Sequence, residues 1–151
     1  MKTMDLKSEK AVTIGDGTDI TLICAGITVL QAAEAAKVLA EEGLSVRVLN
    51  IHTIKPIDEG IMKAIAGYRR LITIEEHNVL GGLGSAVADV IAASGKGCAF
   101  EKLGLQDEFS LVGYPEDLYA HYKLDTNGII EKVREVMGRD FEEDEDWEDE
   151  V

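Results

Sequence analysis

The sequence has no long apolar run. Its 151 residues are 46% hydrophobic with a mean hydropathy of zero, and no segment reaches the roughly 18 consecutive apolar residues that a membrane-spanning helix needs. The first ten residues carry charged side chains where a secretion signal has an apolar centre. We therefore expect no membrane partner and no secretion, and predict a cytoplasmic protein.

Cysteine and histidine are scarce as well. Cys24 and Cys98 lie far apart in the sequence, without a CxxC spacing, and the three histidines form no pair. A structural metal centre usually needs such ligands in closely spaced pairs. We predict no metal site and interpret both cysteines as buried, reduced thiols.

Basic residues are too few to balance the acidic ones. The chain has 29 aspartates and glutamates against 15 lysines and arginines, a formal net charge of −14. Without a basic stripe to meet phosphates, nucleic-acid binding is excluded. Residues 140–151 are nearly all acidic, and we predict a disordered tail there because like charges keep it extended. A solvated terminus is favoured over a recognition tail anchored by Trp147.

What the chain does contain is a regular alternation of apolar runs and amphipathic segments. The expected strands are 11–14, 20–24, 45–50, 70–75 and 99–103. The expected helices are 28–42, a short one from Asp58 through Ile61, Met62 and Ile65 to Gly67, then 85–94, 117–122 and a last one capped by Asn127. Such alternation predicts an α/β fold: a three-layer α/β/α sandwich around a mixed, mostly parallel five-stranded sheet.

The expected domain covers residues 11–139, after a flexible terminus at 1–10. Thr28 is expected to cap the first long helix. Gly15-Asp16-Gly17-Thr18-Asp19 separates the first two apolar runs, and its glycines allow a tight reversal. The first strand is therefore predicted to form an antiparallel hairpin with the second, at one edge of the sheet.

The most informative stretch runs from Leu71 to Ser85. An apolar strand ends in Glu75-Glu76-His77, and the turn Gly81-Gly82-Leu83-Gly84 leads into a helix. In an open α/β sheet the strand carboxyl ends and helix amino ends face one edge, where ligands and partners bind. We expect the chemistry of this chain at that edge.

Glu75 and His77 are candidate catalytic residues. A carboxylate can orient an imidazole, which then moves protons near neutral pH. Because neighbouring side chains of a strand point to opposite faces, Glu76 should face away from both. No nucleophile is evident nearby, so we favour a polar strand end that satisfies backbone donors or contacts another subunit.

The glycine turn is a candidate anion or partner site. The amides of Gly81, Gly82, Gly84 and Ser85 could cradle an anion at a helix amino end, and Lys55 could reach a phosphate or a partner. The turn lacks the lysine of a phosphate loop and the dinucleotide spacing, so a turn without ligand is equally open.

Three tyrosines near Pro115 form a further candidate. Tyr114, Tyr119 and Tyr122 lie close together in the sequence, and aromatic side chains with a polar tip suit both covered edges and contact surfaces. They are expected either to cover the sheet edge or to form a partner surface.

Taken in order, several motifs resemble the carboxyl-terminal domain of the transketolase family. They are Ala25-Gly26, the run from Val48 to Asp58, Ile74-Glu75-Glu76-His77 with Gly81 to Val87, Leu103-Gly104-Leu105 and Tyr122-Lys123-Leu124. The wider group includes deoxyxylulose-phosphate synthase and the beta subunits of 2-oxoacid dehydrogenases. The Glu-Glu-His followed by Gly-Gly-Leu-Gly-Ser is most similar to transketolases, particularly those divided between two polypeptides.

The resemblance implies a five-stranded mixed sheet and, in the complete enzyme, transfer of two-carbon ketol units between sugar phosphates of the pentose phosphate type. It implies thiamin diphosphate and magnesium bound between two other domains. Those enzymes hold the cofactor with a Gly-Asp-Gly and an asparagine pair downstream; here no such pair follows Gly15-Asp16-Gly17, which we interpret as a turn.

The resemblance assigns this chain to subunit packing or regulation. It is expected to bind no cofactor, to be inactive alone, and to join the remaining transketolase domains or an N-terminal subunit in a homo-oligomer such as a dimer. Two alternatives stay open: a stand-alone anion or effector-binding module using Lys55 and the glycine turn, and the C-terminal part of a 2-oxoacid dehydrogenase beta subunit that docks on an acyltransferase core.

Overall fold

A five-stranded sheet runs through the centre of the computed structural model, which describes residues 9–60 and 69–139. The elements are β1 (Val12–Gly15), β2 (Ile20–Cys24), α1 (Thr28–Glu41), β3 (Val46–Asn50), β4 (Arg70–Asn78), α3 (Leu83–Ser94), β5 (Ala99–Leu105), α4 (Pro115–His121) and α5 (Thr126–Met137). The strand order is β1-β3-β2-β4-β5. The pairs β3–β2, β2–β4 and β4–β5 are parallel, whereas β1 runs antiparallel to β3.

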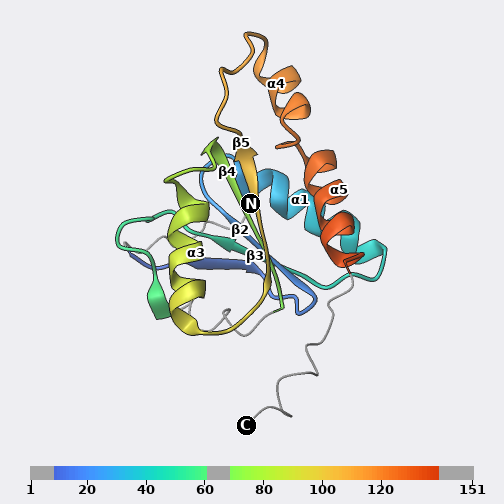
Figure 1. The fold of residues 1–151 in the computed structure, drawn as a ribbon. Helices are drawn as coiled ribbons and strands as arrows, with labels where there is room; N and C mark the ends of the chain where they lie inside the picture. The colour runs from blue at the N-terminus through green and yellow to red at the C-terminus, as the bar shows by residue number, and fades with distance from the viewer. Residues whose placement is uncertain (1–8, 61–68, 140–151) are drawn as a thin grey trace, which may run out of the picture.

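The three longer helices lie in two layers, one on each face of the sheet, and α4 lies beyond the ends of β4 and β5 (Figure 1). α1 and α5 cover one face and α3 covers the other. The predicted fold class, a three-layer α/β/α sandwich around a mixed sheet with an antiparallel edge strand, is therefore confirmed.

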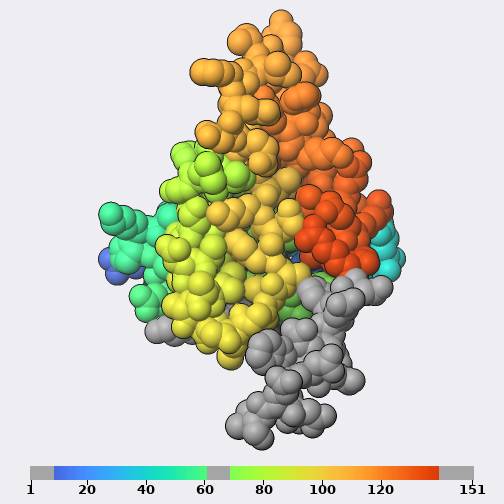
Figure 2. Space-filling view, in the orientation of Figure 1, coloured from blue at the N-terminus to red at the C-terminus, as the bar shows by residue number. Residues whose placement is uncertain are grey.

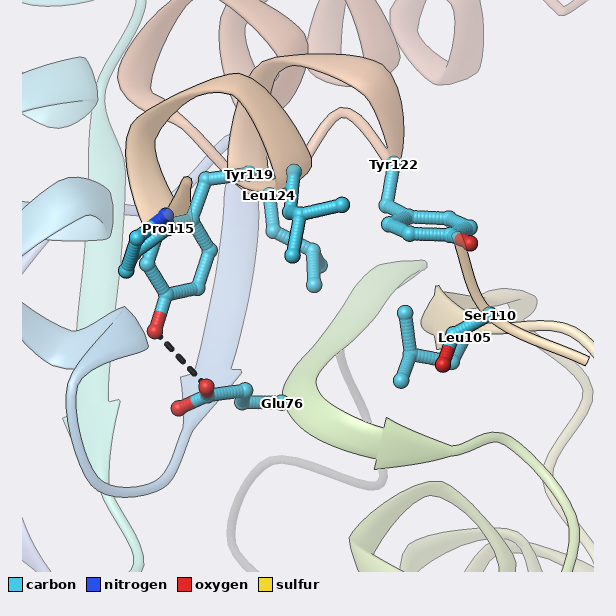
Figure 3. A pocket seen from close by; sticks show the side chains of 8 residues that line it. Glu76, Leu105, Ser110, Pro115, Tyr119, Tyr122 and Leu124 are labelled. Atoms are coloured by element: carbon cyan, nitrogen blue, oxygen red, sulfur yellow. Dashed lines mark hydrogen bonds between the residues drawn. The ribbon is translucent and has the colours of Figure 1, made fainter. Parts of the chain in front are cut away.

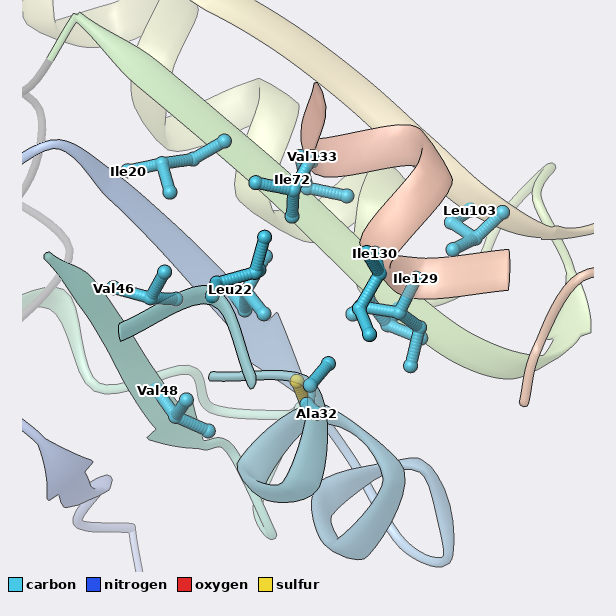
Figure 4. Close-up of a cluster of buried hydrophobic side chains, with 14 of the residues drawn as sticks. Ile20, Leu22, Ala32, Val46, Val48, Ile72, Leu103, Ile129, Ile130 and Val133 are labelled. Atoms are coloured by element: carbon cyan, nitrogen blue, oxygen red, sulfur yellow. The ribbon is translucent and has the colours of Figure 1, made fainter. Parts of the chain in front are cut away.

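The larger core lies between the sheet and the pair α1 and α5, as Figure 4 shows. Leu22 of β2 and Ile72 of β4 point into it and meet Ala32 of α1 and Val133 of α5, all at 0% exposure. Full burial of a leucine or isoleucine side chain contributes roughly 1.5–3 kcal/mol. The alanines of α1 let that helix approach the sheet closely. A smaller core, which includes Ile23 and Leu83, fills the opposite face.

The predicted N-terminal hairpin is wrong. β1 pairs with β3, with Val12 opposite Asn50, because both edges of β2 are already paired in parallel with β3 and β4. The turn between β1 and β2 packs against the start of β3 instead: the Asp19 carboxylate accepts from the Ser45 amide at 2.7 Å. A side chain on Gly17 would overlap the backbone of Ser45 and Val46. The glycines thus mark a reversal correctly, but do not decide which strand pairs with which.

Two predicted helix caps are also wrong. The N-cap of α1 is Ile27, and the Thr28 hydroxyl instead donates to the carbonyl of Ala25 at 2.9 Å and of Ile74 at 3.0 Å. The N-cap of α5 is Asp125, whose carboxylate accepts from the Gly128 amide at 2.9 Å, in place of Asn127. Each predicted cap thus lies one or two residues after the observed N-cap.

Other boundaries shift by a few residues. β4 extends to Asn78 and α3 begins at Leu83. Asp58 accepts from the Gly60 amide at 3.1 Å, as a cap does; the predicted helix residues Ile61, Met62, Ile65 and Gly67 lie outside the described residues, as do positions 1–8 and the acidic segment 140–151.

Both cysteines are free thiols, and only one is fully buried. Cys24 is buried and Cys98 is half-buried, so the prediction of two buried thiols holds for the first alone. Burial raises the pKa of both thiols, which keeps them protonated. Among the described helices, none is long and apolar enough to cross a membrane.

Asp125→Ala is expected to lower the free energy of unfolding by about 1 kcal/mol, because the Gly128 amide loses its acceptor at the start of α5. Asn127→Ala is the matched control, since Asn127 is exposed and makes no cap. Urea denaturation followed by circular dichroism measures both. A loss at Asn127 with none at Asp125 would contradict the observed cap.

Candidate functional site

The strand order places a topological switch point between β2 and β4. The chain leaves β2 through α1 towards β3, and leaves β4 through α3 towards β5, on opposite faces of the sheet. The two loops therefore diverge at the carboxyl ends of these strands, which is where open α/β sheets bind ligands. A hollow of about 460 Å³ lies there, lined by residues 25–27, 75–77 and 81–83 and by Ile54. We call it the switch-point hollow.

Glu75 fills the amino end of α3 with its own carboxylate. The side chain is buried, with Oε1 accepting from the Leu83 amide at 2.9 Å and Oε2 from the Gly84 amide at 2.7 Å. The first amides of a helix lack partners within the helix and carry partial positive charge. Glu75 therefore occupies the position at which an external anion would bind this helix.

The three glycines of the turn are required for different reasons, and Gly82 makes room for that carboxylate. A side chain on Gly82 would overlap Oε1 of Glu75, and one on Gly84 would come within 2.9 Å of Thr73 Oγ1 and of the Lys102 stem. Gly81 has a φ of +79°, which other residues rarely adopt. Close packing thus explains Gly82 and Gly84, and the backbone conformation explains Gly81.

Ser85 links the glycine turn to Lys102 of β5. Its hydroxyl accepts from the Gly81 amide at 2.9 Å and from Lys102 Nζ at 3.2 Å. Lys102 Nζ also donates to the Val79 carbonyl at 3.3 Å. Lys102 was not among the predicted site residues, although a lysine within the apolar strand β5 is a signal that could have identified it.

His77 does not form a hydrogen-bonded pair with Glu75. Its Nδ1 lies 3.8 Å from Glu75 Oε1, too far for a hydrogen bond. Nδ1 instead lies 2.7 Å from the Asn78 carbonyl, to which it donates. The imidazole is largely exposed, and this hydrogen bond does not involve its second nitrogen, Nε2. Both oxygens of Glu75 accept hydrogen bonds from backbone amides, so the geometry lends little support to an acid–base pair. A catalytic role for Glu75 and His77 stays a prediction.

Glu76 points to the other face, as the alternation of a strand predicts. Its Oε1 accepts from the Tyr119 hydroxyl at 2.7 Å (Figure 3), and this hydrogen bond raises the pKa of the Tyr119 phenol. The pair borders a second hollow of about 250 Å³, between α4 and the ends of β4 and β5. Its other lining residues are Leu105, Ser110, Pro115, Leu118, Tyr122 and Leu124. We call it the tyrosine hollow.

The three tyrosines have different positions. Tyr119 and Tyr122 line the tyrosine hollow, and the Tyr122 hydroxyl accepts from the Leu111 amide at 2.9 Å. Tyr114 is 80% exposed.

Lys55 is exposed on the loop after β3, next to Ile54 of the switch-point hollow. The structure thus brings Glu75, His77 and the glycine turn together, with Lys55 close in sequence to a lining residue.

No metal-binding cluster forms within residues 9–60 and 69–139, where no three histidine, cysteine, aspartate or glutamate side chains converge. Asp16 of the Gly-Asp-Gly pairs with Arg47 at 2.6 Å. That ion pair lies at the start of β3, at the sheet edge opposite the switch-point hollow.

Comparison with known proteins gives consistent matches. The family model described as "Transketolase, C-terminal domain" matches residues 9–129. One relative is a subunit of apulose-4-phosphate transketolase from Phocaeicola vulgatus, 42% identical over 129 residues, covering 85% of this chain and 41% of that protein. Another, the 6-deoxy-6-sulfo-D-fructose transketolase subunit SqwH from a Clostridium species, is 35% identical over 133 residues, covering 86% and 40%.

A solved structure described as "Split gene transketolase, inactive beta4 tetramer" superposes with a TM-score of 0.80 at 31% identity, covering 89% of this chain and 44% of that one. This chain spans about two fifths of the length of the apulose-4-phosphate and 6-deoxy-6-sulfo-D-fructose transketolase subunits.

Glu75→Gln is expected to lower the free energy of unfolding by about 1–3 kcal/mol, because an amide side chain offers one acceptor oxygen to two buried backbone donors. Glu76→Gln, one residue on and exposed, should change it by less than about 0.5 kcal/mol. Urea denaturation compares the two. Equal effects would show that the buried carboxylate has no special role.

Gly82→Ala is expected to displace the Glu75 carboxylate and destabilise the protein by about 1–3 kcal/mol. The amides of Leu83 and Gly84 should then exchange hydrogen faster, which NMR measures residue by residue. Gly97→Ala is the matched control because nothing lies within 4 Å of its added carbon. Unchanged protection of both amides in Gly82→Ala would count against the close packing described above.

Proposed function

The chain belongs to the transketolase C-terminal domain family, and on that premise we propose that it is the C-terminal module of a thiamin-diphosphate-dependent transketolase. The complete enzyme would transfer two-carbon ketol units between sugar phosphates in the cytoplasm. The module would contribute subunit packing or regulation and would not catalyse the transfer alone. The observation that carries this proposal is the match over residues 9–129, which includes the whole sheet.

The described residues do not fit the cofactor. The amides of Leu83 and Gly84, which could hold a diphosphate, already donate to Glu75. The Asp16 carboxylate, which could ligate magnesium, pairs with Arg47. Thiamin diphosphate and magnesium would therefore be held by the remaining transketolase domains or by an N-terminal subunit, and the choice of sugar phosphate would be made there too.

The same geometry bears on the stand-alone anion-binding alternative. An anion at the glycine turn would have to displace a buried carboxylate from two short hydrogen bonds. Like charges at one helix end repel, and a buried carboxylate without partners is costly. The packing role is favoured for this reason.

The proposed role is tested by mixing the purified chain with the thiamin-binding portion encoded in the same organism. Ketol transfer, followed by a coupled spectrophotometric assay, is expected in the mixture and absent with this chain alone. Omitting thiamin diphosphate should abolish it. Transfer by the thiamin-binding portion that is the same with and without this chain would refute the proposal.

A further inference from the structure

The segment between β5 and α4 exposes several large apolar side chains. Among the described residues, ten large apolar side chains are exposed, and four of them lie between residues 106 and 114: Phe109, Leu111, Val112 and Tyr114. Phe109 and Val112 are each 103% exposed, as much as in an extended chain. Clustered apolar side chains at a surface mark contact sites, because water contact with them is unfavourable.

This segment and the first turn of α4, residues 106–117, form what we call the arm. The arm projects past the carboxyl ends of the strands, at the top of Figure 1, and forms the protrusion at the top of Figure 2. Every residue from Gln106 to Asp117 is exposed. No neighbouring element among the described residues covers its apolar side chains.

The arm is nevertheless held in a defined position by side-chain hydrogen bonds. Asn78 Nδ2 donates to Asp107 Oδ1 at 3.1 Å, and the Leu111 amide donates to the Tyr122 hydroxyl at 2.9 Å. At the base, the Tyr119 hydroxyl donates to Glu76. A contact segment that is ordered before binding loses less conformational entropy when it binds.

The charge of the arm indicates the chemistry of its partner. Residues 106–117 contain four carboxylates, those of Asp107, Glu108, Glu116 and Asp117, and no lysine, arginine or histidine. Two copies of the arm facing each other would repel. An apolar surface bordered by lysine and arginine side chains would attract the arm and bury its apolar tip.

The tyrosine hollow at the base of the arm suits one such basic side chain. Its walls include Leu118, Leu124 and Tyr119, and Glu76 also lines it. The methylene stem of a lysine or arginine packs against apolar and aromatic walls while its charged head reaches a carboxylate. Glu76 would supply that carboxylate.

We propose that the arm is the element by which this module docks on the thiamin-binding portion of the transketolase, through an apolar surface of that partner bordered by basic residues. This inference rests on the proposed function and adds the surface and the partner's chemistry to it.

The test uses the full chain and the same thiamin-binding portion, with association measured by sedimentation velocity. The double variant Phe109→Ser, Val112→Ser is expected to weaken association at least tenfold. Val38→Ser is the matched control, because Val38 of α1 is an exposed valine outside the arm and should bind as the unaltered chain does. Glu76→Gln should weaken association severalfold. A rise in salt concentration should weaken association of the unaltered chain by a larger factor than association of this variant.

The possible outcomes separate the two proposals. If the unaltered chain associates and restores ketol transfer while the double variant binds as tightly, the arm inference is overturned and the proposed function stands. If the unaltered chain neither binds nor changes ketol transfer, the proposed function fails and the partner named here fails with it. Self-association of this chain alone that the double variant abolishes would also overturn the inference, since the occupant would be a second copy.

Discussion

The two hydrogen bonds from the amides of α3 to the carboxylate of Glu75 determine the structure at the carboxyl edge of the sheet. They tie the end of β4 to the start of the next helix across a short turn. Burying a carboxylate is costly, and these amides, together with the partial positive charge of a helix amino end, offset that cost. The requirement for room beside the carboxylate in turn accounts for Gly82. The Glu75 side chain thus explains one glycine of a sequence that otherwise resembles a ligand loop.

Much of the fold could be predicted from the sequence, because short apolar runs and amphipathic segments differ in period and length. The number of strands, their parallel arrangement and the three layers follow from that alternation. The pairing of β1 could not be predicted, because Gly15 and Gly17 specify a reversal and not the strand that β1 pairs with. The observed partner is β3. Asp125 and Asn127 are both good caps, and only the position of the first helical turn decides between them.

The site was predicted in part. The opposite directions of Glu75 and Glu76 follow from strand geometry and are confirmed by their contacts with α3 and α4. The expectation that the polar strand end satisfies backbone donors is confirmed for Glu75. That these donors are the first amides of α3 depends on the path of a turn, which spacing does not reveal. Of the arm, Tyr114 was a candidate for a partner surface, whereas Phe109 and Val112 were missed. A sequence shows that these two are apolar and does not show that none of the described residues covers them.

The pairing of β1 with β3 has a consequence for the order in which the chain can assemble. A hairpin of the first two strands could close as soon as residues 11–24 leave the ribosome. The observed partner of Val12 is Asn50, at the far end of a strand that itself pairs with β2. Within this sheet β1 is therefore synthesised before its partner, and it can pair only after α1 and β3 have been made.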